Sequence, residues 1–270
     1  MVTAFDEPER LRWDGGAAAY QRSFGTACAY PAAALLDAAG VAAGWRVLDA
    51  GTGPGTVAGL AAARGALVTA VDAEPSMLEV ARRRVPAADV RHGVLPDLAF
   101  PAGSFDAVVA NFVINHVGDP AAAVTELRRV VRPGGRIAVT IWPHPQPPMQ
   151  RLVLDAFENS GAPRPPSVPQ VTADKNFART PDGLSGLLRQ AGLGEVRCTS
   201  ISWVHRTDPD DWWAGPASGL GSLGVLMKEQ SPAVVDRIRS EYDRLAASYL
   251  GADGMLDLPT AALLAYATVE

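Results

Sequence analysis

Apolar and polar positions follow two patterns that alternate between residues 45 and 142. Short apolar runs predict buried β-strands, and longer segments with apolar residues every three or four positions predict amphipathic helices. The expected strands cover residues 45–51, 66–73, 89–95, 104–114 and 136–142, and the expected helices cover residues 55–65, 75–85 and 119–135. Strands alternating with helices of this length imply parallel strands joined by right-handed crossovers, with helices on both faces of the sheet.

Proline and capping side chains mark where several helices begin. Pro75 and Pro120 each stand at an expected first helical turn, and Asp119 precedes Pro120 as a cap. Thr180 and Pro181 repeat this arrangement at the start of a further helix. Proline suits this place because first-turn N–H groups have no partner within the helix, and a Thr or Asp side chain can accept one of them.

The regular alternation is interrupted by the Pro-rich stretch at residues 142–150. Beyond it we expect a helix at 179–193, strands at 195–207 and 262–270, and a helical excursion at 208–250 between these two strands. The whole pattern predicts an α/β fold with a mostly parallel seven-stranded sheet that ends in an antiparallel strand.

Length and composition narrow the class of protein. The chain has 270 residues, of which 48% are apolar and 20% charged, as in soluble globular proteins. We predict one domain over residues 1–270 without a membrane span, and a cytoplasmic location because the N-terminus lacks signal-peptide features. A net charge of −5 without a basic stripe argues against nucleic-acid binding. Cys28 and Cys198 have no metal-like spacing, so no metal site is expected.

The stretch "VLDAGTGPGTVA" at residues 47–58 carries the strongest chemical signal. Gly51, Gly53 and Gly55 follow an apolar strand at every second position and precede a helix. Glycines let a ligand approach the backbone, and the helix N-terminus offers free N–H groups. A dinucleotide site would need the spacing G-x-G-x-x-G, but Thr56 stands at the third place. Asp49, two residues before the first glycine, suits a ligand with a cationic group better than a pyrophosphate.

These residues resemble motif I of the class I S-adenosylmethionine-dependent methyltransferases, in the small-molecule branch similar to the ubiquinone and menaquinone methyltransferases. "VTAVDAEPSMLEVAR" is similar to the second motif, and "FPAGSFDAVVANFVINHVGDPAAAVTELRRVVRPGGRIAV" to the following block. The resemblance implies a Rossmann-like methyltransferase fold that binds S-adenosylmethionine. It implies a helical cap at 1–40, a cofactor-binding core at 41–142, and a substrate-side half at 143–270 with a lid at about 208–250.

The resemblance also assigns cofactor-binding residues. Asp72 would bind the ribose hydroxyls, with Ala73 at that edge and Met77 against the adenine. Val94 stands where similar proteins carry an acid that reaches the adenine amino group, whereas Leu95 can still offer its backbone N–H; Asp97 is a possible substitute. Loss of one such hydrogen bond costs about 0.5–1.5 kcal/mol, so binding would be weakened rather than abolished. The remaining expected cofactor contacts are Tyr20 in the cap, Asn111, Asp49 and the three glycines.

Candidates for catalysis and acceptor binding are fewer. His116 follows a strand end over the expected site and is the candidate general base, with a packing role as the alternative. His144 and His205 stand near later strand ends and would face substrate, whereas His92 is expected to be structural. Two adjacent tryptophans, Trp212 and Trp213, cannot both face inward on one helix, so one would line an apolar pocket and one would pack the lid. Trp212, Trp213, His144 and His116 are the predicted substrate residues.

We therefore expect an enzyme that transfers a methyl group from S-adenosylmethionine to a small apolar metabolite. The Ala-, Gly- and Pro-rich composition resembles that of high-GC bacterial proteins, and by this association we expect a role in bacterial secondary metabolism. The acceptor atom, the need for a base and the oligomeric state stay open. The alternatives are a non-methylating enzyme such as a cyclase on the same scaffold, an NAD(P)-dependent oxidoreductase, and a protein that only binds the cofactor.

Overall fold

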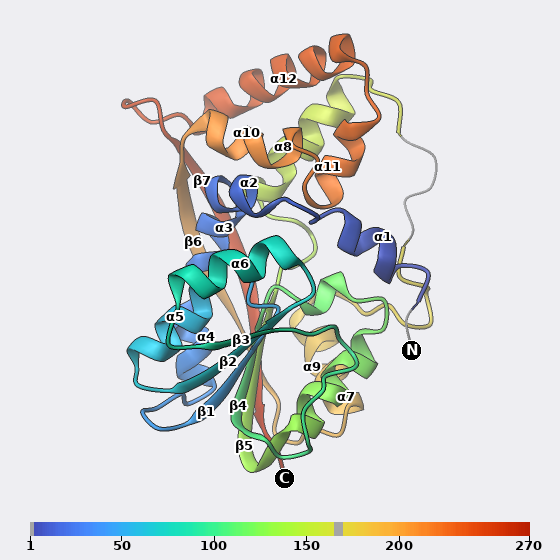
Figure 1. The fold of residues 1–270 in the computed structure, drawn as a ribbon. Coiled ribbons are helices and arrows are strands. Elements are labelled where there is room, and N and C mark those ends of the chain that lie inside the picture. The colour runs from blue at the N-terminus through green and yellow to red at the C-terminus, as the bar shows by residue number, and fades with distance from the viewer. Residues whose placement is uncertain (1–2, 165–169) are drawn as a thin grey trace.

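Seven strands form one sheet in the order β3-β2-β1-β4-β5-β7-β6 in the computed structural model, which describes residues 3–164 and 170–270 (Figure 1). β7 runs antiparallel to both of its neighbours, β5 and β6, and the other pairs of neighbours are parallel. The strands are β1 Arg46–Ala50, β2 Leu67–Asp72, β3 Asp89–His92, β4 Phe105–Asn111, β5 Val131–Ile141, β6 Arg197–Thr207 and β7 Leu256–Thr268. The predicted mostly parallel seven-stranded sheet is confirmed.

Two strands are longer than the sequence pattern predicted. β5 begins at Val131, which pairs with Phe105 before an irregularity in the ladder, so the preceding helix ends at Val130 instead of continuing to residue 135. β7 begins at Leu256 because it pairs with β6 over the full length of that strand, from Leu256 opposite Thr207 onward. In both cases a long-range partner strand supplies hydrogen bonds that local periodicity does not report.

Helices cover both faces of the sheet. α4 Ala32–Ala38 and α5 Thr56–Ala63 contribute to an apolar cluster with β1 and β2 on one face, together with Val85, the residue after α6 Pro75–Arg84. α7 Pro120–Val130 and α9 Pro181–Gln190 contribute to a second cluster with β4, β5 and β7 on the other. Capping confirms three predicted helix starts: Asp119 accepts from the Ala122 N–H, Thr180 accepts from the Gly183 N–H, and Pro75 stands in the first turn of α6.

A third group of helices lies beyond the carboxyl ends of the parallel strands (Figure 1). It comprises α1 Asp6–Leu11, α2 Ala17–Arg22 and α3 Phe24–Ala29 from the N-terminus, with α8 Pro148–Asn159, α10 Pro209–Ala217, α11 Gly221–Lys228 and α12 Pro232–Ala246. α2 contacts α10, and α8 contacts α12 and β7. The apolar cluster of α8, α10 and α12 includes the fully buried Phe157 and Tyr242. None of the helices in residues 3–164 and 170–270 is long and apolar enough to cross a membrane.

The strand order reverses between β1 and β4. β1 lies between β2 and β4, so the chain leaves β1 toward one side of the sheet and leaves β4 toward the other. In open α/β sheets a crevice forms at this switch point, outside the carboxyl ends of the strands. The loop after β1 is held there because the Gly51 and Thr52 N–H groups both donate to the Val71 carbonyl of β2, at 2.8 and 2.9 Å.

We expect Gly55→Ala to destabilise the fold. Gly55 has φ 84°, and an added Cβ would lie 3.2 Å from the Ala81 Cα of α6. A side chain in this left-handed, tightly packed position costs roughly 1–3 kcal/mol, measurable as a lower free energy of unfolding in urea. Gly186→Ala is the matched control, because Gly186 lies in α9 with nothing within 4 Å of the added Cβ. Helix propensity predicts a gain there of about 0.5–1 kcal/mol. Unchanged stability of Gly55→Ala would contradict the packing described.

Candidate active site

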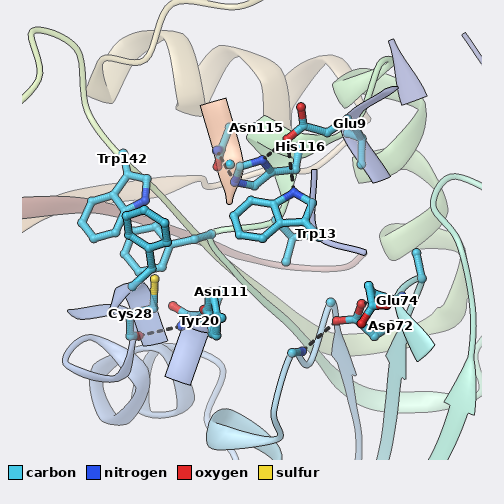
Figure 2. Close-up of a pocket in the computed structure, with 18 of the residues that line it drawn as sticks. Glu9, Trp13, Tyr20, Cys28, Asp72, Glu74, Asn111, Asn115, His116 and Trp142 are labelled. Carbon is cyan, nitrogen blue, oxygen red and sulfur yellow. Dashed lines mark hydrogen bonds and ion pairs between the residues drawn. The ribbon is translucent and has the colours of Figure 1, made fainter. Parts of the chain in front are cut away.

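A cavity of about 310 Å³ lies at the carboxyl edge of the parallel strands, beneath the N-terminal helices. Its wall combines the ends of β1, β2 and β4 with side chains from α1, α2, α3, α8 and α10. Figure 2 shows Asp72 and Glu74 on one side of this cavity and Trp142 on the other. The volume is typical of a site for a small molecule, and the two ends differ in chemistry.

Asp72 provides the carboxylate at the sheet end of the cavity. It is the last residue of β2, and its two oxygens accept from two backbone N–H groups: Oδ2 from Gly53 at 2.7 Å and Oδ1 from Glu74 at 2.9 Å. Burial raises the pKa of Asp72, and the N–H donors of Glu74 and Gly53 oppose that rise. The carboxylate is thereby held in a fixed orientation against the glycine loop while it faces the cavity.

The three glycines of the loop have different surroundings. Gly51 and Gly53 line the cavity, and both have positive φ values, 71° and 54°. A side chain at Gly51 would overlap Val113. Gly55, predicted to contact the cofactor, does not line the cavity but packs against Ala81 of α6. That prediction is wrong about the contact, because the chain has already turned into α5 at Gly55, the residue before its first turn.

Asp49 occupies a different position from the one predicted. Its side chain is fully buried beneath the glycine loop and is absent from the cavity wall, so it does not present a carboxylate to a ligand there. The Thr52 hydroxyl donates to Asp49 Oδ2 at 2.7 Å, and Oδ1 has no partner among the described residues. Burial disfavours the charged form and raises the pKa of Asp49 to about 7, although the Thr52 hydrogen bond opposes this.

Apolar groups continue the wall beside Asp72. Ala73, Met77, Val94 and Leu95 all line the cavity, as the sequence predicted for this edge. Asp97, the possible substitute for the acid missing at Val94, is exposed and does not line it.

Tyr20 and Asn111 connect the N-terminal helices to β4. Both line the cavity. The Asn111 amide donates to the Cys28 carbonyl at 2.8 Å, and its Oδ1 accepts from the Thr140 hydroxyl at 2.6 Å. Burial raises the pKa of Tyr20 well above its usual value, and the neighbouring Cys28 and the Asp72 carboxylate add to the rise. Tyr20 is therefore neutral and can act as a hydrogen-bond donor.

His116 lies in the short helical turn η1 (Ile114–His116) after β4 and faces the cavity. Its Nδ1 is 2.7 Å from Glu9 Oε1, and its Nε2 is 2.9 Å from the Asn115 Nδ2 (Figure 2). The Trp13 ring meets the imidazole edge to face at 5.2 Å. An ionised Glu9 can only accept, so the proton belongs on Nδ1 and the lone pair on Nε2.

Glu9 reaches His116 from α1, more than one hundred residues earlier in the chain. It is buried, and its carboxylate accepts from His116, from the Trp13 indole N–H and from Arg12. Burial raises the pKa of Glu9, but the hydrogen bonds from His116 and Trp13 and the charge of Arg12 outweigh this and hold it below its usual value. Glu9 is therefore ionised at neutral pH.

Aromatic rings dominate the far end of the cavity. Phe112 and Trp142 stack with their ring centroids 3.9 Å apart, and Phe112 holds a left-handed φ of 59°, which is rare for a bulky residue. Trp212 of α10 meets Phe24 edge to face at 5.5 Å. Two nitrogen donors in this part of the wall, Gln150 Nε2 and Trp212 Nε1, are buried without a partner among the described residues.

Several predicted substrate residues lie elsewhere. His144 is exposed and does not line the cavity, because its backbone N–H binds the Arg179 carbonyl in a surface turn. Trp212 lines the cavity. Trp213 lies outside the cavity wall and packs against Tyr242, with the two ring centroids 5.1 Å apart. The two tryptophans thus divide as the sequence predicted, one at the pocket and one in the helical lid, and both are buried because α10 is covered on two sides. His205 is buried next to Trp212 outside the cavity wall, and burial lowers its pKa to about 4.

Sequence reasoning missed part of the wall. Glu9, Asn115, Gln150 and Arg179 all line the cavity but stand in no recognisable motif. The sequence could have predicted Trp142, because this residue directly follows β5, one of the parallel strands whose carboxyl ends form the site. For the other four, only the packing of α1, η1, α8 and the segment before α9 brings the side chain to the cavity.

Comparisons with known proteins agree with this arrangement. Residues 48–139 match the family described as methyltransferase domain. The demethylmenaquinone methyltransferase of Clavibacter sepedonicus is 37% identical over 172 residues, covering 59% of this chain and 70% of the relative. Its counterpart of the same name in Paenarthrobacter aurescens is 38% identical over 189 residues, covering 66% of this chain and 75% of the relative.

A solved structure extends the likeness in fold to the whole chain. Phosphoethanolamine N-methyltransferase 2 of Haemonchus contortus, in complex with phosphomonomethylethanolamine and S-adenosylhomocysteine, is similar with a TM-score of 0.58. It is 17% identical, and the match covers 100% of this chain and 61% of that one. Because the two sequence relatives are matched over most of their own length, they identify the family, whose cofactor is S-adenosylmethionine. The chain belongs to the class I S-adenosylmethionine-dependent methyltransferases, and it is similar to their demethylmenaquinone methyltransferases.

Proposed function

We propose that this protein transfers the methyl group of S-adenosylmethionine to a small, flat, largely apolar acceptor held between Trp142 and Trp212. One observation carries the proposal: a single cavity joins the Asp72 carboxylate and the glycine loop to an aromatic chamber with His116 on its wall. Residues 1–270 act as one unit, in which α10 to α12 form the lid over the acceptor. The relatives are named for demethylmenaquinone, which supports a ring compound as the class of acceptor. An acceptor from secondary metabolism remains the expectation from composition.

The residues at the sheet end fit the cofactor. Asp72, pinned by two N–H groups, has lone pairs left on both oxygens for the paired ribose hydroxyls. Gly51 and Gly53 leave the backbone open beside it, and the apolar wall of Ala73, Met77, Val94 and Leu95 suits the adenine. Tyr20 and Asn111 stand on the path toward the chamber and would hold the amino-acid portion. The cofactor supplies a methyl carbon on a sulfonium, ready for in-line displacement.

Catalysis by this chain rests first on positioning. An acceptor stacked in the aromatic chamber is held close to the methyl group, and such alignment can replace much of the entropy cost of a bimolecular reaction. His116 would serve acceptors whose nucleophile carries a proton. Its Nε2 lone pair points to the Asn115 amide, and an acceptor hydroxyl that displaces this amide meets a proton acceptor whose Nδ1–H is held by Glu9.

Asp49 has a supporting role in this proposal. It is buried beneath the loop and holds Thr52, so it fixes the loop from behind rather than touching the ligand. The proposed acceptor site does not include His144, which is exposed, or Trp213, which packs outside the cavity wall.

Calorimetric titration with S-adenosylmethionine, S-adenosylhomocysteine and NADH tests the cofactor assignment. We expect binding of the first two and no heat from NADH. Asp72→Asn should weaken S-adenosylhomocysteine binding at least tenfold, because it removes charge-assisted hydrogen bonds to the ribose, each of about 1.5–3 kcal/mol. The exposed Asp37→Asn is the control and should bind normally. NADH binding alone, or unchanged affinity of Asp72→Asn, would overturn the assignment.

The buried Asp49 predicts a pH dependence of stability. In the unfolded chain this carboxyl has a pKa of about 4, and in the fold about 7. Between these values the folded state holds a proton that the unfolded state has lost, so the free energy of unfolding falls as the pH rises from about 4 to 7. Asn cannot titrate, so Asp49→Asn lacks this contribution. We expect the free energy of unfolding of Asp49→Asn, minus that of the wild type, to increase as the pH rises across this range, measured by urea denaturation at several pH values. A constant difference would contradict a raised pKa.

The His116 role is tested by turnover with a panel of naphthols and 1,4-dihydroxynaphthalenes and radiolabelled S-adenosylmethionine. His116→Gln should lower kcat by about 10²–10⁴ for a hydroxyl acceptor, the usual contribution of general base catalysis. The affinity for S-adenosylhomocysteine should stay within about twofold, the size of a minor perturbation. His92→Gln, on the exposed β3, is the control. Near-normal turnover by His116→Gln would assign His116 to packing.

A further inference from the structure

Arg179 places an unpaired guanidinium in the wall of the cavity. It belongs to the segment just before α9 and is anchored by its carbonyl, which accepts from the His144 N–H at 2.8 Å. Its side chain lines the cavity, half buried, yet it has no hydrogen bond or ion pair with any residue in 3–164 and 170–270. The five N–H donors of its guanidinium therefore have no acceptor in the described part of the chain.

The nearby carboxylates do not supply that acceptor. Glu9 interacts with Arg179 electrostatically, but its two oxygens already accept from His116, Trp13 and Arg12. Asp6 is likewise engaged, by Thr3 and by the Gly118 N–H at 2.7 Å. Burial lowers the pKa of Arg179, and the Glu9 charge opposes this. The guanidinium is thus partly withdrawn from water and has no partner among the described residues, which is unusual for a charged group.

Two further donors in the cavity wall lack acceptors. Gln150 is fixed by Thr260, whose hydroxyl donates to its Oε1 at 3.1 Å, and this leaves Nε2 buried and unpaired. Trp212 Nε1 is also buried and unpaired. Buried polar groups in folded proteins are nearly always satisfied, by protein, water or ligand. In the described part of the wall, the buried acceptor without a partner is Asn115 Oδ1, so donors are in excess.

We propose that Arg179 binds an anionic oxygen of the acceptor, a carboxylate, an enolate or a phenolate attached to the flat ring that occupies the aromatic chamber. This inference rests on the proposed function and specifies its substrate class. A guanidinium presents two parallel N–H groups and so recognises a planar oxyanion in one orientation, while the rings of Phe112, Trp142 and Trp212 contact the apolar body. The site thereby discriminates acidic aromatic acceptors from neutral ones.

Arg10 is the alternative cation for this role. It also lines the cavity, from the last turn of α1, and no hydrogen bond or ion pair of its side chain is found among residues 3–164 and 170–270. A test of Arg179 therefore needs both residues in parallel, with the same substitution.

The experiment is a calorimetric titration with two probes of nearly the same shape, 1-hydroxy-2-naphthoate and 1-hydroxy-2-naphthamide, of which the first carries a carboxylate and the second a neutral amide. Each is titrated into wild type, Arg179→Met, Arg179→Lys and Arg10→Met, with and without saturating S-adenosylhomocysteine. In the wild type the acid should bind at least about tenfold more tightly than the amide, as one hydrogen bond to a charged group predicts. Arg179→Met should reduce this preference to about twofold or less, Arg179→Lys should keep part of it, and Arg10→Met should keep all of it.

The outcomes separate the two proposals. If S-adenosylhomocysteine fails to bind the wild type, the proposed function falls, and the preference for the acid is read from the titrations without it. Normal S-adenosylhomocysteine binding by every variant shows an intact fold and cofactor end. Equal affinities for acid and amide in the wild type would overturn the Arg179 proposal. So would a preference that survives in Arg179→Met, one lost in Arg10→Met instead, or no saturable binding of either probe.

Discussion

The reversal of strand order between β1 and β4 is the constraint on which the site depends. Because the connections leave these two strands toward opposite sides, no crossover covers the sheet edge between them. The glycine loop is then pinned across this edge by hydrogen bonds to β2, from Gly51 and Thr52 to the Val71 carbonyl and from Gly53 to Asp72. The same contacts that close the loop orient the Asp72 carboxylate toward the cavity, so loop geometry and cofactor recognition are one structural feature.

The N-terminal helices complete the cavity through polar contacts with η1 and β4. Glu9 binds His116, Asp6 accepts from the Gly118 N–H, and the Cys28 carbonyl accepts from Asn111. α2 also contacts α10, so the segment bridges the sheet and the helices of the substrate-side half (Figure 1). Motion of these helices would therefore alter the cofactor end, the proposed base and the acceptor chamber together.

Buried and partly buried charged groups in this region fall into two kinds. Glu9 and Asp72 each have a set of donors that accounts for both oxygens. Asp49 Oδ1 and the Arg179 side chain have none among the described residues. Asp49 meets this by a raised pKa, since a neutral carboxyl tolerates burial. Arg179 remains charged in practice, and it faces a cavity, which is why an anionic ligand group accounts for it best.

The sequence by itself determined the parallel sheet, the helix starts at Pro75, Asp119 and Thr180, the open glycine loop, and the placement of Asp72, Ala73, Met77, Val94 and Leu95 around one cavity. The sheet, the helix starts and the open loop follow from local periodicity, from capping residues and from the rule that parallel strands end at a common edge. The placement of the five residues around one cavity is what the resemblance to the methyltransferase family implied. The tertiary structure decided that Asp49 and Gly55 lie outside the cavity wall, that His144 is exposed, that Trp212 rather than Trp213 faces the cavity, and that Glu9 and Arg179 join the wall. The direction of a side chain at a strand end or in a loop depends on what packs against it, and here that neighbour is a helix or segment far away in the chain.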